Sequence, residues 1–356
     1  MSWEDNVRRV VPYVAGEQPK GRVIKLNTNE FPYAPSPQVA TKMYDLAEKE
    51  IEGDTSMLRK YPDMDATDLV DAISQVYDVP FDNIFVGVGS DDVLAMSFLT
   101  FFNSEKPILF PDITYSFYDV WANLFKIPFE TKALDDEFSI KKDDYLIPNG
   151  GIVIPNPNAP TGVYEEPRMF EDIVKANPSS VVIIDEAYVD FGATSCLPLI
   201  KKYDNVLVVQ TLSKSRALAG LRVGVAFGSK KLIDYLKDVK FSFNSYTMNY
   251  PSIQLATASI LDVPYWKRTV KKLVKTREWT KKELKDLGFS FRDSYANFIF
   301  ATHESMAAKD IFEKLKENDI YVRYFNKPRI NNYLRISIGT DADMKTVISK
   351  LKEIIK

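Results

Sequence analysis

Short apolar runs alternate with longer helix-like stretches through the middle of the chain, and this alternation limits the possible folds more than any other feature. The runs are rich in Val and Ile and scarcely alternate with polar residues, as expected of strands buried on both faces of a parallel sheet. The sequence therefore predicts an α/β fold, with a mostly parallel central sheet flanked by crossover helices. The predicted strands are Ile84–Val88, Pro107–Phe110, Gly151–Ile154, Val181–Ile184, Val206–Gln210 and Val223–Phe227, and the helices between them include Asp91–Phe102, Ser116–Leu124 and Pro167–Lys175.

The chain of 356 residues is longer than one hydrophobic core usually organises, so we expect two domains. We predict an N-terminal arm at residues 1–34 that joins the small domain, and a large domain at residues 35–245. A linking helix and the C-terminal small domain would occupy residues 246–356. The patterns behind this division are helical stretches at Lys230–Phe241 and Ser252–Leu287, then a smaller α+β section with strands at Val23–Leu26, Ala296–Phe300, Tyr321–Tyr324 and Leu334–Ile338 and a closing helix at Ala342–Ile355.

Composition excludes several classes of function. The formal net charge of −3 gives no reason to expect a nucleic-acid or membrane-surface partner. Met1–Val14 lacks the apolar core of a signal peptide, and no window approaches 18 apolar residues. Because Cys196 is the only cysteine, we expect a reducing compartment and a cytoplasmic protein. Because His303 is the only histidine, we expect no metal site and no His-based catalytic triad.

Polar residues follow the predicted strands at the points where those strands end. In a parallel sheet these carboxyl ends lie along one edge, where ligands bind. The segments that follow the runs are Gly89-Ser90-Asp91-Asp92, Pro111–Tyr115, Pro155–Gly162, Asp185-Glu186-Ala187-Tyr188 and Thr211–Lys214. The sequence therefore predicts that an aromatic ring, an amide, a carboxylate and a lysine converge on one edge of the sheet.

Each of these residues also has an ordinary structural interpretation. Asp185 could cap a helix, Tyr115 could pack in the core, and Lys214 could be a surface lysine. Gly87-Val88-Gly89 could be a tight turn, since it lacks the third glycine of a dinucleotide-binding motif. The joint placement of these residues favours a functional site.

The convergent set matches the needs of a pyridoxal phosphate (PLP) site. Such a site needs a lysine amine for a Schiff base, a carboxylate for the pyridine nitrogen, and an aromatic side chain beside the ring. The phosphate needs backbone N–H groups at a helix N-terminus and a cation. Asp91, which opens a helix after Ser90, the Ser213 hydroxyl and the Arg222 guanidinium are candidates for the phosphate end.

The segment from Ser213 to Gly224 resembles the PLP-lysine signature of the class-II, fold-type-I aminotransferases. Asp185–Tyr188 and Pro160-Thr161-Gly162 match the same family in order and spacing, and the resemblance extends from about Tyr13 to the C-terminus. Four further segments are most similar to the branch of that family that uses histidinol phosphate as amino donor: Asn27–Pro32, Tyr61-Pro62-Asp63, Val322–Phe325 and Leu334–Thr340.

The resemblance implies a role for each candidate residue. Lys214 would hold the cofactor and move the substrate proton, Asp185 would pair with the pyridine nitrogen, and Tyr188 would donate to the phenolic oxygen. Tyr61 would reach the cofactor of a neighbouring subunit, which implies a homodimer. The remaining implied contacts are Tyr115 on the ring, Ser90, Asp91, Ser213 and Arg222 around the phosphate, and Arg335 with Arg323, Asn29 and Tyr13 around the substrate's anionic group.

The chain departs from the family pattern in two places. The family usually has Asn immediately before Pro-Thr-Gly, where it bonds the phenolic oxygen, but this chain has Ala159 there. Either Asn158 takes over this contact, or Tyr188 and water make it; we include Asn158 among the cofactor-binding candidates. The second departure is Phe243–Thr247, which lies near the expected position of the substrate side chain.

The activity implied by the resemblance is transamination between L-histidinol phosphate and 2-oxoglutarate in histidine biosynthesis. The alternatives on the same scaffold are an aromatic or broad-range aminotransferase and a threonine-phosphate decarboxylase. A nicotinamide-dependent oxidoreductase would rest on Gly87-Val88-Gly89, and a non-catalytic regulator would need an additional DNA-binding domain.

Overall fold

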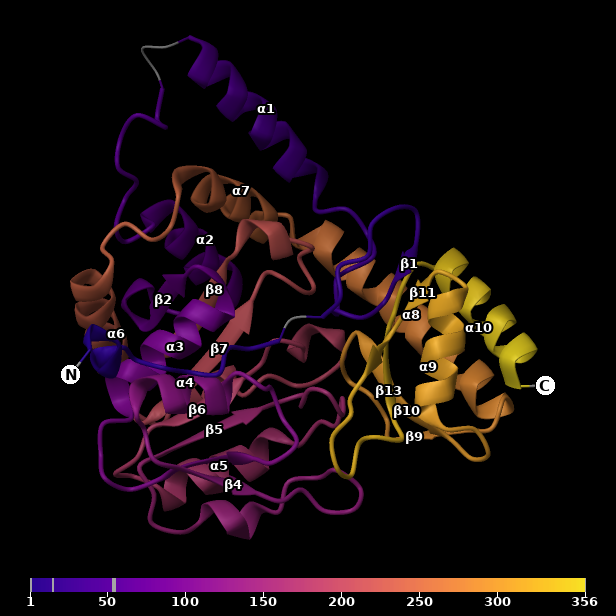
Figure 1. Ribbon diagram of the computed structural model, residues 1–356. Helices are drawn as coiled ribbons and strands as arrows, with labels where there is room; N and C mark the ends of the chain where they lie inside the picture. Colours follow the sequence, from indigo (N-terminus) through magenta and orange to yellow (C-terminus); the bar gives the residue numbers. More distant parts are fainter. Residues whose placement is uncertain (1, 15, 53–55, 356) are drawn as a thin grey trace.

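The computed structural model describes residues 2–14, 16–52 and 56–355, and its centre is a seven-stranded sheet (Figure 1). Six strands run in one direction, and β8 is antiparallel to both of its neighbours. The predicted α/β fold with a mostly parallel sheet is therefore confirmed. In spatial order the strands are β2 (Ile84–Gly87), β8 (Gly224–Gly228), β7 (Val206–Thr211), β6 (Val182–Asp185), β5 (Gly151–Pro155), β3 (Ile108–Pro111) and β4 (Phe129–Lys132).

Helices cover both faces of this sheet because alternate side chains of its buried strands point to opposite faces. On one face, Phe85, Ile183 and Leu207 belong to an apolar cluster with residues of α3 (Gly89–Phe101), α4 (Tyr118–Phe125) and α6 (Lys230–Phe243). On the other face, Val86, Ile184 and Val208 belong to a cluster with residues of three further helices, α2 (Thr67–Tyr77), α5 (Pro167–Ala176) and α7 (Tyr250–Leu261). Helix α1 (Pro37–Ile51) packs against α7, and its far end extends away from the body (Figure 1).

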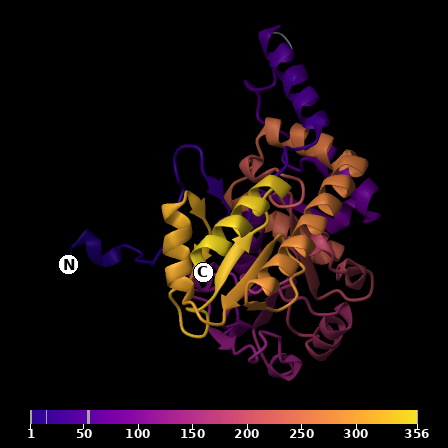
Figure 2. The same ribbon diagram turned by 90° about the vertical axis from the view of Figure 1, so that its right-hand side faces the viewer.

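The C-terminal third forms a second layer of strands and helices beside the large sheet (Figures 1 and 2). Its antiparallel sheet has the order β12 (Arg323–Tyr324), β13 (Leu334–Ser337), β10 (Phe298–His303) and β9 (Phe289–Phe291). Its helices are α8 (Val263–Asp286), α9 (Ala308–Glu317) and α10 (Asp341–Ile355). The N-terminal segment joins this layer, because β1 (Ile24–Lys25) pairs in parallel with β11 (Ile320–Tyr321).

The proposed division into domains at residues 34 and 245 stays a prediction. Helix α7, which follows residue 245, packs against α1 and α2 of the large unit, and α8 leads into the smaller one. In the described ranges, no helix is long and apolar enough to cross a membrane.

Candidate active site

The residues that follow the sheet strands surround a pocket at the carboxyl ends of β6 and β7. Asp185 is the last residue of β6, and Lys214 lies three residues beyond the end of β7. Tyr115 and Tyr188 come from the loops after β3 and β6. The predicted residues that line this pocket are Ser90, Asp91, Tyr115, Asp185, Tyr188, Ser213, Lys214 and Arg222.

Asp185 lines the pocket and is almost completely buried. Tyr118 Oη donates to its Oδ2 at 2.8 Å, and the Ala187 amide donates to its Oδ1 at 3.2 Å. Burial raises the pKa of Asp185 to about 6, against the lowering effects of these hydrogen bonds and of Lys214. A cation beside this carboxylate would favour its ionised form, and a protonated pyridine nitrogen is such a cation. Sequence reasoning missed Tyr118, although its spacing of three from Tyr115 was a usable signal.

Lys214 lies between two adjacent pockets. Its Nζ lies 3.5 Å from the carbonyl oxygen of Thr28 and 5.7 Å from the centroid of the Tyr188 ring. We call the pocket at the ends of β6 and β7 the cofactor pocket, and a second pocket toward β12 and β13 the substrate pocket. The two pockets share Tyr115, Ala159, Tyr188 and Lys214 in their linings. The amine can therefore face a ligand in either pocket.

The opposite end of the cofactor pocket is suited to an anion. Ser90 and Asp91 lie in the first turn of α3, where backbone N–H groups and the helix dipole favour negative charge. Gly89 has a φ of +85°, and a Cβ there would lie 2.3 Å from an Arg222 guanidinium nitrogen, so only glycine allows this approach. Arg222 NH1 lies 3.5 Å from Ser213 Oγ.

Asp91 orients two residues of this end of the pocket. Its Oδ2 pairs with Arg222 NH2 at 2.9 Å, and its Oδ1 accepts from Tyr115 Oη at 2.7 Å. Burial, followed by the Asp91 charge, raises the pKa of Tyr115, so this side chain stays a neutral donor. The lysine, the buried carboxylate, the aromatic ring and the anion-binding turn together fit pyridoxal phosphate.

Asn158 and Tyr61 are the two predicted cofactor ligands that do not line this pocket in the described part of the chain. Asn158 Nδ2 donates to the Ile113 carbonyl oxygen and to Thr161 Oγ1, and its Oδ1 accepts from Thr114 Oγ1. Its amide therefore holds the loop, while Ala159 lines the pocket. Tyr61 is 81% exposed and stacks on Tyr246 with the ring centroids 4.7 Å apart.

The four predicted substrate residues meet in the second pocket, whose lining includes Tyr13, Asn29, Arg323 and Arg335. Arg323 and Arg335 are directly opposite each other on the antiparallel strands β12 and β13. Arg335 NH2 donates to the Asn27 carbonyl oxygen at 2.9 Å, but its buried Nε has no hydrogen-bond partner among the described residues. Burial, and secondarily Arg323, lowers the pKa of Arg335.

Two like charges opposite each other on a sheet are unfavourable unless an anion lies between them. This pair therefore indicates an anion site next to Lys214. Over the ranges that the structure describes, no group of three or more His, Cys, Asp or Glu side chains could hold a metal ion.

Comparison with known proteins agrees with this geometry. Residues 21–351 match the family described as "Aminotransferase class I and II". The chain therefore belongs to the class I and II aminotransferases, which confirms the predicted enzyme class.

Within that family, similar curated relatives are histidinol-phosphate aminotransferases. The protein of Lactococcus lactis subsp. lactis (strain IL1403) is 48% identical over 357 residues, covering 100% of this chain and 97% of the relative. That of Clostridium botulinum (strain Okra / Type B1) is 49% identical, covering 99% and 98%. Among solved structures, the histidinol-phosphate aminotransferase of Sinorhizobium meliloti in complex with pyridoxal-5'-phosphate superimposes with a TM-score of 0.84 at 21% identity, covering 94% of this chain and 90% of that one. This last likeness supports the fold-type-I assignment.

Proposed function

We propose that this protein binds pyridoxal phosphate through Lys214 and catalyses transamination between L-histidinol phosphate and 2-oxoglutarate. The products are imidazole acetol phosphate and L-glutamate, as part of histidine biosynthesis. The observation that carries the proposal is the paired guanidiniums of Arg323 and Arg335 in a pocket that shares Lys214 with the cofactor site. Relatives about 48% identical over the full chain are named for this activity.

The reaction uses a small set of side chains around the cofactor. When bound, pyridoxal phosphate supplies an electron sink that stabilises negative charge at the α-carbon of the donor. The Asp185 carboxylate, oriented by Tyr118 and the Ala187 amide, would keep a proton on the pyridine nitrogen. The Lys214 amine would act as the general base that removes the proton from the donor's α-carbon and would hold that proton for its return.

One anion site must serve both substrates, because histidinol phosphate carries a phosphate where glutamate has its α-carboxylate. A guanidinium matches either group through paired N–H donors. Arg335 is rigidly held by the Asn27 carbonyl oxygen and stands over the rings of Phe298 and Phe325, with centroid distances of 5.4 and 5.6 Å. Arg323 stands over Phe325 at 5.6 Å. These apolar rings would exclude water and so strengthen the ion pairs of both guanidiniums with the substrate's anionic group.

The proposed enzyme is a homodimer in which Tyr61 of each subunit reaches the other subunit's cofactor phosphate. Support comes from the exposure of Tyr61 and from apolar side chains exposed near it along the chain, which a second copy would cover: Met43, Tyr44, Ile51 and Leu58. The beginning of the N-terminal arm also exposes Trp3 and Val11, and it extends away from the body (Figure 2). A cytoplasmic location is proposed from the single, buried Cys196, which suits a reducing compartment.

A donor screen tests the function directly. The purified, PLP-loaded enzyme is given histidinol phosphate, phenylalanine, tyrosine or phosphothreonine, with 2-oxoglutarate as acceptor, and glutamate and carbon dioxide are measured. The proposal expects the highest kcat/KM with histidinol phosphate and formation of glutamate. A preference for phenylalanine or tyrosine would indicate an aromatic aminotransferase. Carbon dioxide release from phosphothreonine would indicate a decarboxylase and contradict the proposal.

A further inference from the structure

The side chain of Asn29 makes a buried hydrogen bond with Tyr188, which lines both the cofactor pocket and the substrate pocket. Asn29 Nδ2 lies 2.8 Å from Tyr188 Oη, and the Asn29 side chain is almost completely buried. Its backbone has a φ of 56°, a left-handed conformation that asparagine tolerates better than most residues. Such a conformation at a buried polar residue indicates that the position of the amide matters.

The hydrogen bonds around Asn29 fix which of its amide atoms faces Tyr188. The Asn29 backbone N–H donates to Ser337 Oγ at 3.1 Å, so the Ser337 hydroxyl proton is available for another acceptor. Ser337 Oγ donates it to Asn29 Oδ1 at 2.9 Å. Because Oδ1 is the acceptor of this bond, Nδ2 is the atom that donates to Tyr188 Oη.

This assignment determines the direction of the Tyr188 hydroxyl proton. A phenolic oxygen that accepts from Asn29 keeps its own proton for a different acceptor. Among the described residues, Asn29 is the only hydrogen-bond partner of Tyr188 Oη. The Tyr188 ring is held by an edge contact with Phe298, at a centroid distance of 5.1 Å, and Tyr188 lines both pockets. The proton is therefore left for a ligand in the pocket.

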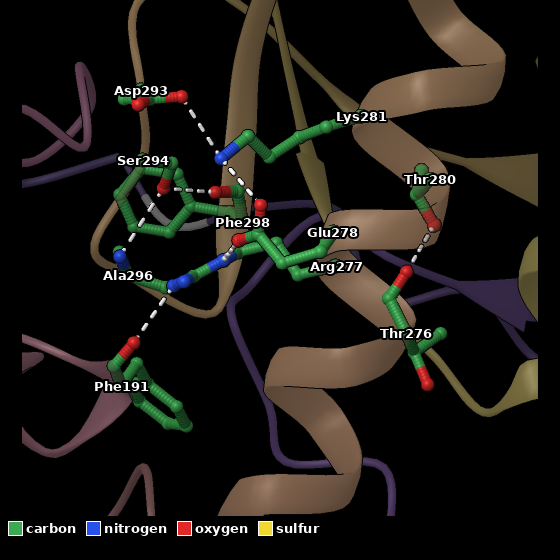
Figure 3. Close-up of polar contacts among 10 residues, drawn as sticks. All are labelled: Phe191, Thr276, Arg277, Glu278, Thr280, Lys281, Asp293, Ser294, Ala296 and Phe298. Carbon is green, nitrogen blue, oxygen red and sulfur yellow. Dashed lines mark hydrogen bonds and ion pairs between the residues drawn. The ribbon is translucent and has the colours of Figure 1, made fainter.

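Two further contacts fix this arrangement to the smaller unit. Asn297 Nδ2 donates to the Asn29 carbonyl oxygen at 2.9 Å. Arg277 NH1 lies 2.9 Å from the carbonyl oxygens of both Phe191 and Ala296 (Figure 3). One guanidinium thus joins the turn that follows Tyr188 to the turn that carries Asn297.

We propose that Asn29 is a positioning residue, which makes Tyr188 a hydrogen-bond donor to the phenolic oxygen of the bound cofactor. Ala159, which lines the same pocket, offers no side-chain donor, and the Asn158 amide is engaged with Ile113 and Thr161. Tyr188 is then the side chain on which this contact depends, and Asn29 controls it. The inference rests on attachment of the cofactor to Lys214, which the proposed function requires.

The test is a pH titration of the absorbance of the bound cofactor. A hydrogen bond to the phenolic oxygen withdraws negative charge and makes the nitrogen that links the cofactor to Lys214 less basic. Asn29→Gly removes the amide and keeps the left-handed backbone. We expect it to raise the midpoint of the titration by about one pH unit, as does Tyr188→Phe. In the Tyr188→Phe background, Asn29→Gly should add nothing, because the hydroxyl that it orients is gone.

Asn27→Ala is the matched control. Asn27 lines the substrate pocket like Asn29, but its amide donates to the Glu17 carbonyl oxygen and not to Tyr188. The midpoint of the pH titration in Asn27→Ala should equal that of the wild type. Ser337→Ala loosens Asn29 Oδ1 without touching Tyr188 and should give a smaller shift of the same sign, which provides a second route if Asn29→Gly unfolds.

The outcomes separate this inference from the proposed function. A normal cofactor spectrum with an unchanged midpoint in Asn29→Gly, or in Ser337→Ala if Asn29→Gly does not fold, would overturn the inference. A higher KM for the donor with an unchanged midpoint would mean that Asn29 contacts only substrate, and would overturn it equally. A wild-type protein that shows no cofactor absorbance would contradict the proposed function itself.

Discussion

The cofactor pocket and the substrate pocket share Lys214 but are built in different ways. The cofactor pocket is formed at the ends of fully buried strands, and its buried carboxylate, Asp185, is the last residue of one of them. The substrate pocket combines the short strands β12 and β13 and the N-terminal arm, including residues 27–29, with loops that follow β3 and β5 of the large sheet. The first is therefore fixed by the core of the large sheet, and the second depends on how separate segments meet. We expect substitutions in the first to affect every substrate alike and those in the second to change substrate preference.

Lys214→Ala should have the largest effect. Loss of both the cofactor attachment and the general base should reduce transamination by at least about 10³-fold for every donor. Stopped-flow measurement of the donor half-reaction checks this. The control is Lys201→Ala, because Lys201 is an exposed lysine paired with Asp78 and should leave the rate unchanged. A Lys214→Ala enzyme within tenfold of wild type would contradict the account of the cofactor pocket.

Arg335→Gln should come next and should distinguish between substrates. Loss of a partly buried guanidinium that faces the substrate's anionic group should lower kcat/KM for histidinol phosphate and for glutamate by about 10²-fold. The absorbance spectrum of the bound cofactor should stay unchanged, because Arg335 does not line the cofactor pocket in the described residues. Arg323→Gln should have a smaller effect, since only Arg335 is fixed in this pocket by a hydrogen bond to the Asn27 carbonyl oxygen. Equal losses for a neutral amine donor would show that the arginines do not bind the anionic group.

The pH dependence of the free energy of unfolding should show a property of the cofactor pocket that the substrate pocket lacks. The pKa of Asp185 is raised from 3.8 to about 6 by burial, so the cofactor-free protein binds this proton more tightly than the unfolded chain. The contribution of the Asp185 carboxyl group to the free energy of unfolding is fully present below pH 4 and is lost as the pH rises through 6. Relative to Asp185→Asn, the cofactor-free wild type should lose about 3 kcal/mol of unfolding free energy across this window.

Urea unfolding at pH 4, 5, 6 and 7 measures this difference. The neighbouring Glu186, whose pKa burial raises to about 7, is present in both proteins, so its contribution cancels. PLP should reduce the loss in the wild type, because a pyridinium stabilises the ionised carboxylate. Parallel pH profiles for the two cofactor-free proteins would show that Asp185 is not the group responsible.

Tyr61→Phe should have the smallest effect, a loss of cofactor affinity of about tenfold or less, because it removes one hydrogen bond to the phosphate. Fluorescence titration with PLP measures it, and Tyr246→Phe, on the ring that stacks against Tyr61, is the control. The Tyr61 effect should disappear on dilution to monomers if the hydroxyl acts across the subunit interface. An effect that persists in monomers would contradict the proposed shared site.

The contrast between the two pockets also explains what could be predicted from the sequence. Apolar runs such as Val206–Gln210 mark buried strands, so the residues that follow them could be placed at one edge before the structure was known. Strand β4 was missed because three of its four side chains are exposed, and an edge strand with Glu130 and Lys132 lacks an apolar pattern. The stretch Ser252–Leu287, predicted as one or two helices, forms two, and Asp262 caps the second, α8.

Contacts between distant segments were not predictable in the same way. The role of Asn29 toward Tyr188 depends on Ser337, 308 residues further along the chain, and no local pattern indicates that pairing. Asn158 shows the opposite problem: its proximity to the expected motif suggested a cofactor contact, but its amide is bonded within the loop. Whether it contacts the cofactor stays a prediction.

The central claim is that Lys214 holds pyridoxal phosphate in the pocket that it lines together with Asp185. The most direct measurement is borohydride reduction of the PLP-loaded wild type, followed by proteolysis and mass spectrometry of every lysine-containing peptide. The account predicts one phosphopyridoxyl adduct, on Lys214, with the yield lost in Lys214→Ala and retained in Lys201→Ala. An adduct on another lysine, or an equal yield in Lys214→Ala, would contradict it.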